Sequence, residues 1–152
     1  EESLRLTAIS AQEKKITIEQ CLSDDLEMVG DRRAMKQVML NLLSNALKFT
    51  DEGGRIIVRA RRSESGFLLT IADTGIGIPK TALAKIGQPF EQVQSQYAKS
   101  KGGSGLGLAI SRSLVALHGG SMRIRSCVGK GTVVSLSVPE CATFAVPRPA
   151  IS

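Results

Sequence analysis

The sequence is poor in the residues that build disulfide frameworks, zinc sites and base-stacking surfaces. Its 152 residues include three cysteines, Cys21, Cys127 and Cys141, and no Cys-x-x-Cys pair. This odd set argues against a disulfide framework or a zinc knuckle and favours a reducing, cytoplasmic compartment. Aromatic residues make up 3% of the chain and tryptophan is absent, so few rings are available to stack on single-stranded nucleic acid bases.

Long apolar runs, a secretion signal and a P-loop are missing as well. No stretch approaches the roughly 18 apolar residues that a membrane-spanning helix needs. The start, Glu1-Glu2-Ser3, lacks the basic and then apolar pattern of a signal peptide. No GxxxxGK[ST] or His-Arg-Asp motif occurs, and Gly129-Lys130-Gly131-Thr132 has glycine where a P-loop requires serine or threonine. We therefore expect a soluble domain without a P-loop.

What the chain does have is an excess of positive charge. Its 20 lysines and arginines against 14 acidic residues give a net charge of +6. This excess fits either a polyanion-binding surface or a domain that handles phosphates. The basic residues are scattered and accompanied by few aromatics, so we expect no nucleic-acid partner.

The spacing of hydrophobic residues predicts one α/β domain. Helical spacing predicts a helix from the N-cap Asp31 to Phe49, a second one from Gly105 to His118 and a short one opening at Pro79. Alternation predicts strands at 15–20, 55–61, 67–73, 122–127 and 132–138. Strands joined by turns favour a two-layer α/β sandwich, in which helices cover one face of a mixed, mostly antiparallel sheet.

The domain is expected to span residues 15–139. Within it, the polar segment 87–104 lacks hydrophobic periodicity, and a loop of that length is usually functional, for example as a lid. Residues 1–14 are polar and resemble the end of a preceding helix, and residues 140–152 predict a flexible tail.

Three polar residues follow one edge of the predicted helix at 31–49. Asn41, Asn45 and Lys48 lie within roughly 60° of one another on a helix, beside an apolar stripe. An amide oxygen suits Mg²⁺ and a lysine suits phosphate, so this edge fits a ligand-facing surface. A solvated polar face is the alternative, weakened because asparagine is a poor residue inside a helix.

Two glycine-rich segments add further candidate positions. Asp73 ends a buried strand face before Gly75 and Gly77, where its carboxylate needs donors such as the amino group of adenine; an ordinary Asp-Thr-Gly turn is the alternative. The run from Gly102 to Ile110 leads into a helix whose N-terminus suits phosphates. The only histidine, His118, is expected to cap or pack at a helix end.

The order of these motifs closely resembles the N, G1, F and G2 boxes of sensor histidine kinases. The matching stretches are Asn41 to Thr50, Asp73 to Ile78, Pro89 to Gln92 and Gly103 to Leu108. The chain resembles their catalytic ATP-binding domain, of the family shared with gyrase B, Hsp90 and MutL. The sequences of residues 89–101 and 30–33 are similar to those of alphaproteobacterial cell-cycle kinases of the PleC and DivJ type. The resemblance spans about residues 15–139 and implies the Bergerat ATP-binding fold.

Carried over by position, the resemblance implies a binding site for ATP and Mg²⁺. It assigns the metal to Asn45, the adenine amino group to Asp73, and the anchoring of the lid to Phe90. Independently of the resemblance, Lys99 and Lys101 of the expected lid are candidates to approach the outermost phosphate, with a solvated basic loop as the alternative. The other implied ATP-binding positions are Asn41, Lys48, Gly75, Gly77, Ile78, Gly103, Gly105, Leu106, Gly107, Leu108 and Thr132.

The resemblance also implies a phosphotransferase that is incomplete without partners. The family phosphorylates a histidine on a dimerisation domain, and no such motif occurs here. We therefore expect no catalytic residue on this chain, no autophosphorylation by the chain alone, transfer to the dimerisation domain of the same parent protein, and a response regulator receiver domain as a further partner. The parent could be attached to a membrane through other segments. The alternatives are a degenerate docking module, an anti-sigma-type serine kinase, and a nucleic-acid binder supported only by the net charge.

Overall fold

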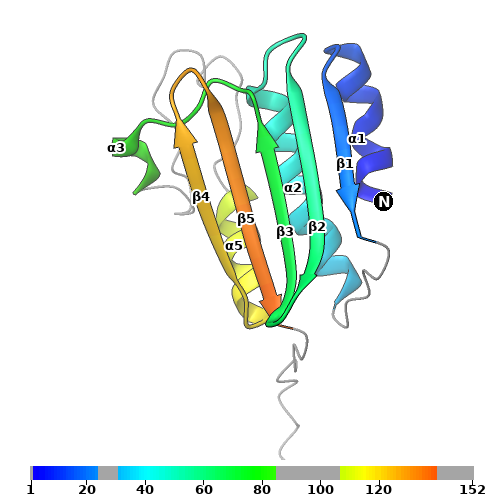
Figure 1. Cartoon of the computed structure of the whole chain (residues 1–152), viewed down its shortest axis with the longest axis vertical. Helices are drawn as coiled ribbons and strands as arrows, with labels where there is room; N and C mark the ends of the chain where they lie inside the picture. The colour runs from blue at the N-terminus through cyan, green and yellow to red at the C-terminus, as the bar shows by residue number, and fades with distance from the viewer. Residues whose placement is uncertain (1, 24–30, 85–106, 140–152) are drawn as a thin grey trace, which may run out of the picture.

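The computed structural model describes residues 2–23, 31–84 and 107–139. The expected lid at 87–104 and tail at 140–152 therefore lie wholly outside the described residues. Figure 1 shows the described elements in chain order, which are α1 (Glu2–Glu13), β1 (Thr17–Leu22), α2 (Arg32–Phe49), β2 (Arg55–Ser63), β3 (Gly66–Asp73), α3 (Lys80–Leu83), α5 (Gly107–Leu117), β4 (Ser121–Cys127) and β5 (Gly131–Pro139).

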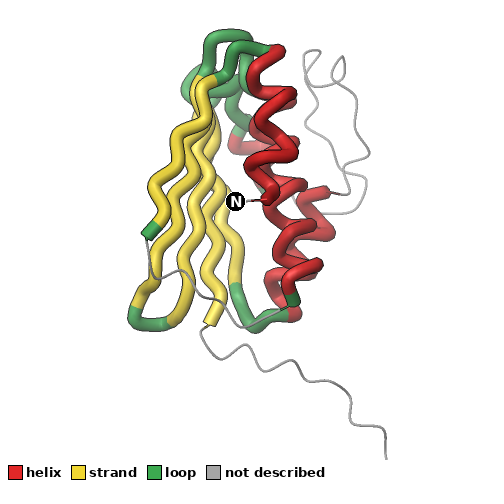
Figure 2. The backbone as a smooth tube through the Cα atoms, turned by 90° about the vertical axis from the view of Figure 1, so that its right-hand side faces the viewer, coloured by secondary structure: helices red, strands yellow, loops and turns green. Residues whose placement is uncertain are grey.

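The strands form a mixed sheet with the order β1-β2-β3-β5-β4. β1 pairs with β2 in parallel, whereas the other neighbours pair antiparallel. Figure 2 shows the helices on one side of this sheet. The predicted two-layer sandwich is thus confirmed.

The core lies between the sheet and α2. Alternate residues of β2, among them Ile56 and Val58, face the helices and are almost completely buried. From α2, Val38 and Leu43 are fully buried against them. Removing such aliphatic side chains from water is the main favourable contribution to folding, about 1.5–3 kcal/mol for each one.

Both ends of α2 are fixed by side-chain contacts. At its start, the Asp31 carboxylate accepts from the backbone N–H groups of Arg33 (2.9 Å) and Ala34 (3.2 Å), which confirms the predicted N-cap. At its end, the Lys14 ammonium donates to the carbonyl oxygens of Leu47 (2.5 Å) and Thr50 (2.8 Å). A cation there satisfies carbonyls that lack partners inside the helix and complements the helix dipole.

α1 is packed into the same layer as α2. It contacts α2 and β1, and its side chains Leu4 and Ala11 are buried members of the core. The predicted helical character of residues 1–14 agrees with this packing, and their role as the end of a connector stays a prediction. The first strand begins two residues later than predicted, because Lys14 and Lys15 form a turn in which Lys15 has a φ of 53°.

Within the described parts of the chain, no helix is both long enough and apolar enough to span a lipid bilayer.

Candidate functional site

Three polar side chains lie in a row at one end of the sheet, on the face covered by helices. Asp73 is the last residue of β3 and pairs in register with Thr132 of β5, which pairs in turn with Ser126 of β4. Asp73 follows Leu69 and Ile71 at alternate positions, and both of these are buried against the helices. The three polar side chains therefore lie on the same face of the sheet as the hydrophobic core, at the end where that face becomes polar.

The Asp73 carboxylate is held by the turn that follows it. Its Oδ1 accepts a hydrogen bond from the backbone N–H of Gly75 at 2.9 Å. Burial raises the pKa of Asp73 above its ordinary value, and the backbone N–H groups of Gly75 and Thr132 lower it by a smaller amount. An acceptor that is partly removed from water in this way gains from a ligand that brings an N–H donor.

Ser126 also belongs to this row, although no local pattern in the sequence singled it out. Its Oγ accepts from the backbone N–H of Ile78 (2.7 Å), donates to the Gly131 carbonyl (2.9 Å) and lies 2.7 Å from Thr132 Oγ1. A hydroxyl has one proton to donate, so the Thr132 hydroxyl donates to Ser126. The oxygen of Thr132 is thereby oriented as an acceptor for a water molecule or a ligand.

The loop at 74–78 fits tightly between α2 and the turn that joins β4 to β5. The Ile76 N–H donates to the Phe49 carbonyl at the end of α2 (3.1 Å), and the Ile76 carbonyl accepts from the Gly129 N–H (2.8 Å). A Cβ at Gly75 would overlap the Phe49 carbonyl oxygen, and one at Gly77 would overlap the Cys127 carbonyl oxygen. Gly77 also has a φ of 76°, which favours glycine. The predicted glycine positions are thus required by close backbone contact.

The polar edge of α2 divides into residues with different contacts. The Asn41 amide donates to the Gly107 carbonyl and to Ser111 Oγ, both at 3.2 Å, and its oxygen accepts from Gln37 at 2.9 Å. Asn41 therefore joins α2 to the start of α5. Asn45, one turn later, is partly buried and has no hydrogen-bond partner among the described residues. The Lys48 ammonium lies 5.2 Å from the centre of the Phe49 ring.

The structure brings together most of the predicted positions that it describes. Asp73, Gly75, Gly77, Ile78 and Thr132 share one end of the sheet through the contacts given above. Asn41 contacts Gly107 at the start of α5, and the next residue, Leu108, packs partly buried against the core. The predicted positions that lie outside the described residues are Phe90, Lys99, Lys101, Gly103, Gly105 and Leu106.

The donor set fits a metal ion only in combination with a ligand. The described residues contain no group of three His, Cys, Asp or Glu side chains that could hold a metal ion. The Asn45 amide oxygen is a hard ligand of the kind that Mg²⁺ accepts, and no protein donor among the described residues occupies it. Magnesium typically takes one or two protein oxygens together with phosphate oxygens and water, so Asn45 fits this role.

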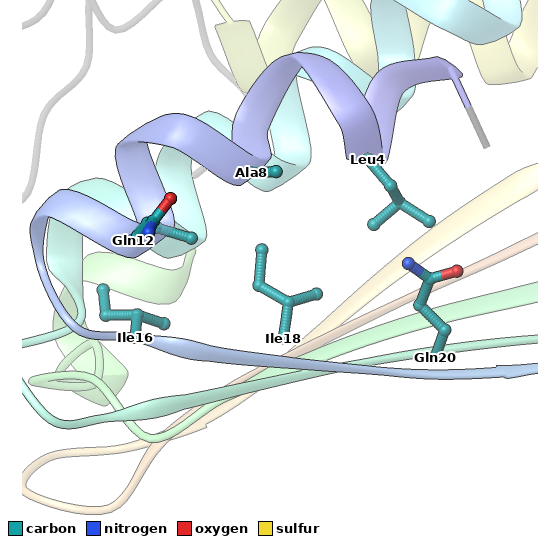
Figure 3. Close-up of a pocket in the computed structure, with 7 residues that line it drawn as sticks. Leu4, Ala8, Gln12, Ile16, Ile18 and Gln20 are labelled. Atoms are coloured by element: carbon teal, nitrogen blue, oxygen red, sulfur yellow. The ribbon is translucent and has the colours of Figure 1, made fainter.

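A pocket of about 350 Å³ lies elsewhere, between α1 and β1. Figure 3 shows Ile18 and Gln20 of β1 and Ile16, which precedes this strand, pointing toward α1, where Leu4, Ala8 and Gln12 lie. None of the residues predicted to bind the nucleotide lines this pocket. It is therefore separate from the polar row at the end of β3.

Comparison with known proteins gives consistent results. Residues 30–142 match the family described as histidine kinase-, DNA gyrase B-, and HSP90-like ATPase. The histidine protein kinase DivJ of Caulobacter vibrioides is 45% identical over 115 residues, which cover 76% of this chain and 19% of that protein. The chain spans less than a quarter of the length of DivJ and of two other curated relatives, the non-motile and phage-resistance protein of Caulobacter vibrioides and a sensor-like histidine kinase of Rhizobium meliloti.

Solved structures of sensor kinases have the same fold. The mycobacterial sensor histidine kinase MprB superposes with a TM-score of 0.78 at 31% identity, over 91% of this chain and 93% of that one. Full-length ShkA, solved in complex with AMPPNP, superposes with a TM-score of 0.78 at 33% identity, over 91% of this chain and 28% of that one.

Proposed function

Because this chain belongs to the family of histidine kinase-, DNA gyrase B- and HSP90-like ATPases, and is an ATP-binding catalytic module of the histidine kinase type, we propose that it binds Mg·ATP and donates the γ-phosphoryl group to a histidine on a separate dimerisation domain. The observation that carries the proposal is the partly desolvated Asp73 carboxylate at the end of β3, held by Gly75 and next to Thr132. The AMPPNP complex of ShkA supports a nucleotide as the ligand.

Asp73 is proposed to select adenine. A carboxylate accepts hydrogen bonds only, and the 6-amino group of adenine is a donor. Guanine has a carbonyl oxygen at that position, so two acceptors would face each other. The oriented Thr132 hydroxyl provides a second acceptor beside Asp73, directly or through water.

Asn45 and Lys48 are proposed to act at the phosphates. Asn45 would hold Mg²⁺ through its amide oxygen, and Lys48, one turn further along α2, would attract the phosphate oxygens. When bound, the metal ion supplies positive charge against the charge of the phosphates. The other proposed phosphate contacts, Lys99 and Lys101, belong to the segment proposed as a lid.

The transfer itself requires little covalent chemistry from this chain. A nitrogen of the partner's imidazole forms a bond to the γ-phosphorus while the bond from that phosphorus to the bridging oxygen breaks and ADP leaves. Positioning and charge stabilisation provide most of the catalysis in such transfers. The chain's own histidine does not suit the acceptor role, since His118 is 4% exposed and its Nδ1 lies 2.7 Å from the Leu114 carbonyl oxygen.

We therefore propose that the chain cannot autophosphorylate alone. Its proposed partners are the dimerisation domain of its parent protein and a response regulator receiver domain, and its proposed location is the cytoplasm. Incubation with Mg·ATP should leave no phosphohistidine on this chain, whereas adding the dimerisation domain should produce phosphohistidine on that domain. Phosphohistidine on this chain alone would contradict the proposal. A serine kinase is less well supported because the curated relatives include named histidine kinases.

The adenine assignment is tested by Asp73→Asn in a calorimetric titration with ATP and GTP. Asparagine keeps the size of the side chain but replaces one acceptor with an N–H donor. An unmatched buried polar group costs about 1–3 kcal/mol, so we expect ATP affinity to fall by about tenfold to a hundredfold. The wild type should prefer ATP to GTP. Asp51→Asn, the same change at an exposed position, serves as the control; equal ATP affinity in both variants would overturn the assignment.

The metal assignment is tested by Asn45→Ala, with ATP titrated in the presence and absence of Mg²⁺. We expect the variant to lose the gain in affinity that Mg²⁺ provides, while its affinity for metal-free ATP stays close to that of the wild type. The neighbouring exposed residue provides the control Ser44→Ala, which should keep the full magnesium effect. If Asn45→Ala also keeps this effect, Asn45 does not hold the metal.

A further inference from the structure

The face of the sheet opposite the helices carries a regular pattern of charge. Figure 2 shows that no described element covers this outer face. The register puts Arg59, Thr70, Ser135 and Arg123 in one line across β2, β3, β5 and β4. Positive charge therefore lies on both sides of two neutral central strands.

Two pairs of arginines form these flanks. We call Arg59 and Arg61 the β2 row, and Arg123 and Arg125 the β4 row. All four side chains are exposed, and within the described residues none forms an ion pair. Arg55, at the end of β2, differs because it pairs with Glu19 of β1 at 3.1 Å. The two rows thus present positive charge that the described protein does not neutralise.

The strip between the rows is neutral and weakly apolar. It consists of the outward side chains of β3 and β5, all partly buried, namely Leu68, Thr70, Ala72, Val133, Ser135 and Ser137. No acidic or aromatic side chain of β3 or β5 faces outward here. The strip can therefore contact small apolar side chains of a ligand, while the arginines of the two rows contact acidic groups on either side of that ligand.

The width of the strip matches an α-helix. Neighbouring strands lie about 4.8 Å apart, so β2 and β4, with two strands between them, are about 14 Å apart. A helix with its side chains is about 10–12 Å wide. On the inner face, α2 and α5 already lie along the same strands (Figure 1). A helix on the outer face would lie between the two rows, with its flanks within reach of arginine side chains.

We propose that the outer face docks an acidic amphipathic helix of a partner protein along β3 and β5. Its apolar stripe contacts Leu68, Ala72 and Val133, and its flanking carboxylates pair with the β2 and β4 rows. Guanidinium groups bind carboxylates in pairs of parallel hydrogen bonds, which fixes the register of such a helix. This surface is separate from the nucleotide site, so the proposal is independent of the proposed function.

Other anionic partners fit this face less well. A lipid surface is usually bound through large apolar or aromatic side chains that enter the headgroup region, and no aromatic residue of the described strands faces outward. Single-stranded nucleic acid needs aromatic rings on which its bases stack, and the described part of this face offers none. The favoured partner is therefore a protein helix.

The test uses the full chain and a labelled helical peptide of about 18 residues, five turns long, with leucine and alanine on one face and glutamate on both flanks. Fluorescence anisotropy measures binding. The row variants are Arg59→Glu with Arg61→Glu, and Arg123→Glu with Arg125→Glu. Each should weaken binding by about tenfold or more, because two attractive contacts become repulsive. Arg5→Glu with Arg112→Glu changes the net charge equally on α1 and α5, and should alter affinity by less than about twofold.

A further variant separates docking from general attraction between opposite charges. Thr70→Trp fills the strip without changing the charge, and should also weaken binding. An unchanged circular dichroism spectrum and an unchanged thermal unfolding transition establish that each variant is folded. Equal loss in the row variants and the Arg5/Arg112 control, no effect of Thr70→Trp, or no binding of the peptide to the wild type would overturn the proposal. So would row-dependent binding of phosphatidylserine vesicles or DNA in place of the peptide.

Discussion

Among single residues, two glycines separate the effect of backbone conformation from that of close contact. Gly77 and Gly129 have nearly the same φ, 76° and 80°. A Cβ at Gly129 would meet nothing within 4 Å, whereas a Cβ at Gly77 would overlap the backbone of Cys127. The two positions therefore differ in their surroundings much more than in their dihedral angle.

We expect Gly129→Ala to lower the free energy of unfolding by about 1–2 kcal/mol, the cost of a left-handed conformation for a residue with a Cβ. Gly77→Ala should cost more, because the loop at 74–78 or the turn after β4 must also move. It should in addition weaken ATP binding, since this loop follows Asp73. Urea denaturation and an ATP titration of both variants measure the difference, and equal stabilities would show that the Gly77 contact is unimportant.

The candidate site was partly predictable from local sequence. A carboxylate at the end of a buried strand needs a donor, so alternation made Asp73 a candidate, with an ordinary Asp-Thr-Gly turn as the alternative. The resemblance then assigned Asp73 to adenine. The resemblance supplied Thr132. Ser126 could not be selected, because its place beside Thr132 depends on the register between β4 and β5, which local spacing does not determine.

Among the elements, α2 depends on contacts from outside its own sequence at its C-terminal end. Lys14, from the turn after α1, donates to two of its last carbonyls, and the Phe49 carbonyl accepts from Ile76 of the glycine loop. The start of the helix is different, because Asp31 is adjacent in sequence and was recognisable as an N-cap. Hence the N-terminal end was predictable and the C-terminal contacts were not.

We expect Lys14→Met to lower the free energy of unfolding by about 1–2 kcal/mol, since it leaves carbonyls of α2 without a charged donor and keeps the length of the side chain. The next residue provides a matched control. Lys15 forms an exposed ion pair with Glu52 at 3.2 Å, with side chains 77% and 66% exposed, so Lys15→Met should cost less than about 0.5 kcal/mol. Thermal denaturation compares the two variants; equal effects would mean that the cap adds nothing.

The order and type of the helices and strands could be predicted from the spacing of hydrophobic residues, whereas the pairing of strands in the sheet could not. Alternation located each strand to within about two residues, with the largest error at β1, where the turn at Lys14 and Lys15 displaced the start. The parallel pairing of β1 with β2 required knowledge of how α1 and α2 pack, because a strand pattern does not identify its neighbour. The mixed character of the sheet was nevertheless inferred from the order of helices and turns.

For the molecule as a whole, α1 belongs to the folded unit in which the proposed nucleotide site lies. Leu4 is 6% exposed and part of the core, whereas Leu6, two residues later, is 56% exposed. The burial of Leu4 extends the core to the edge of the sheet, beside the pocket between α1 and β1. Stability should therefore depend on this N-terminal helix.

We expect Leu4→Ala to lower the free energy of unfolding by about 2–3 kcal/mol, through lost burial and an enlarged pocket. Leu6→Ala should change it by less than about 0.5 kcal/mol because its side chain is already largely in water. Chemical denaturation monitored by circular dichroism gives both values. A Leu4 variant as stable as the Leu6 variant would mean that α1 folds independently of the sheet.

The position of β4 at one end of the strand order has a consequence for self-association. Its outward edge has no strand partner among the described residues, and unpaired backbone groups on such an edge can recruit a second sheet. Arg123 and Arg125 lie on this strand, and like charges on two approaching edges repel. Removing both charges would favour aggregation at high protein concentration, which is why charge reversal is preferable to alanine wherever this strand is mutated.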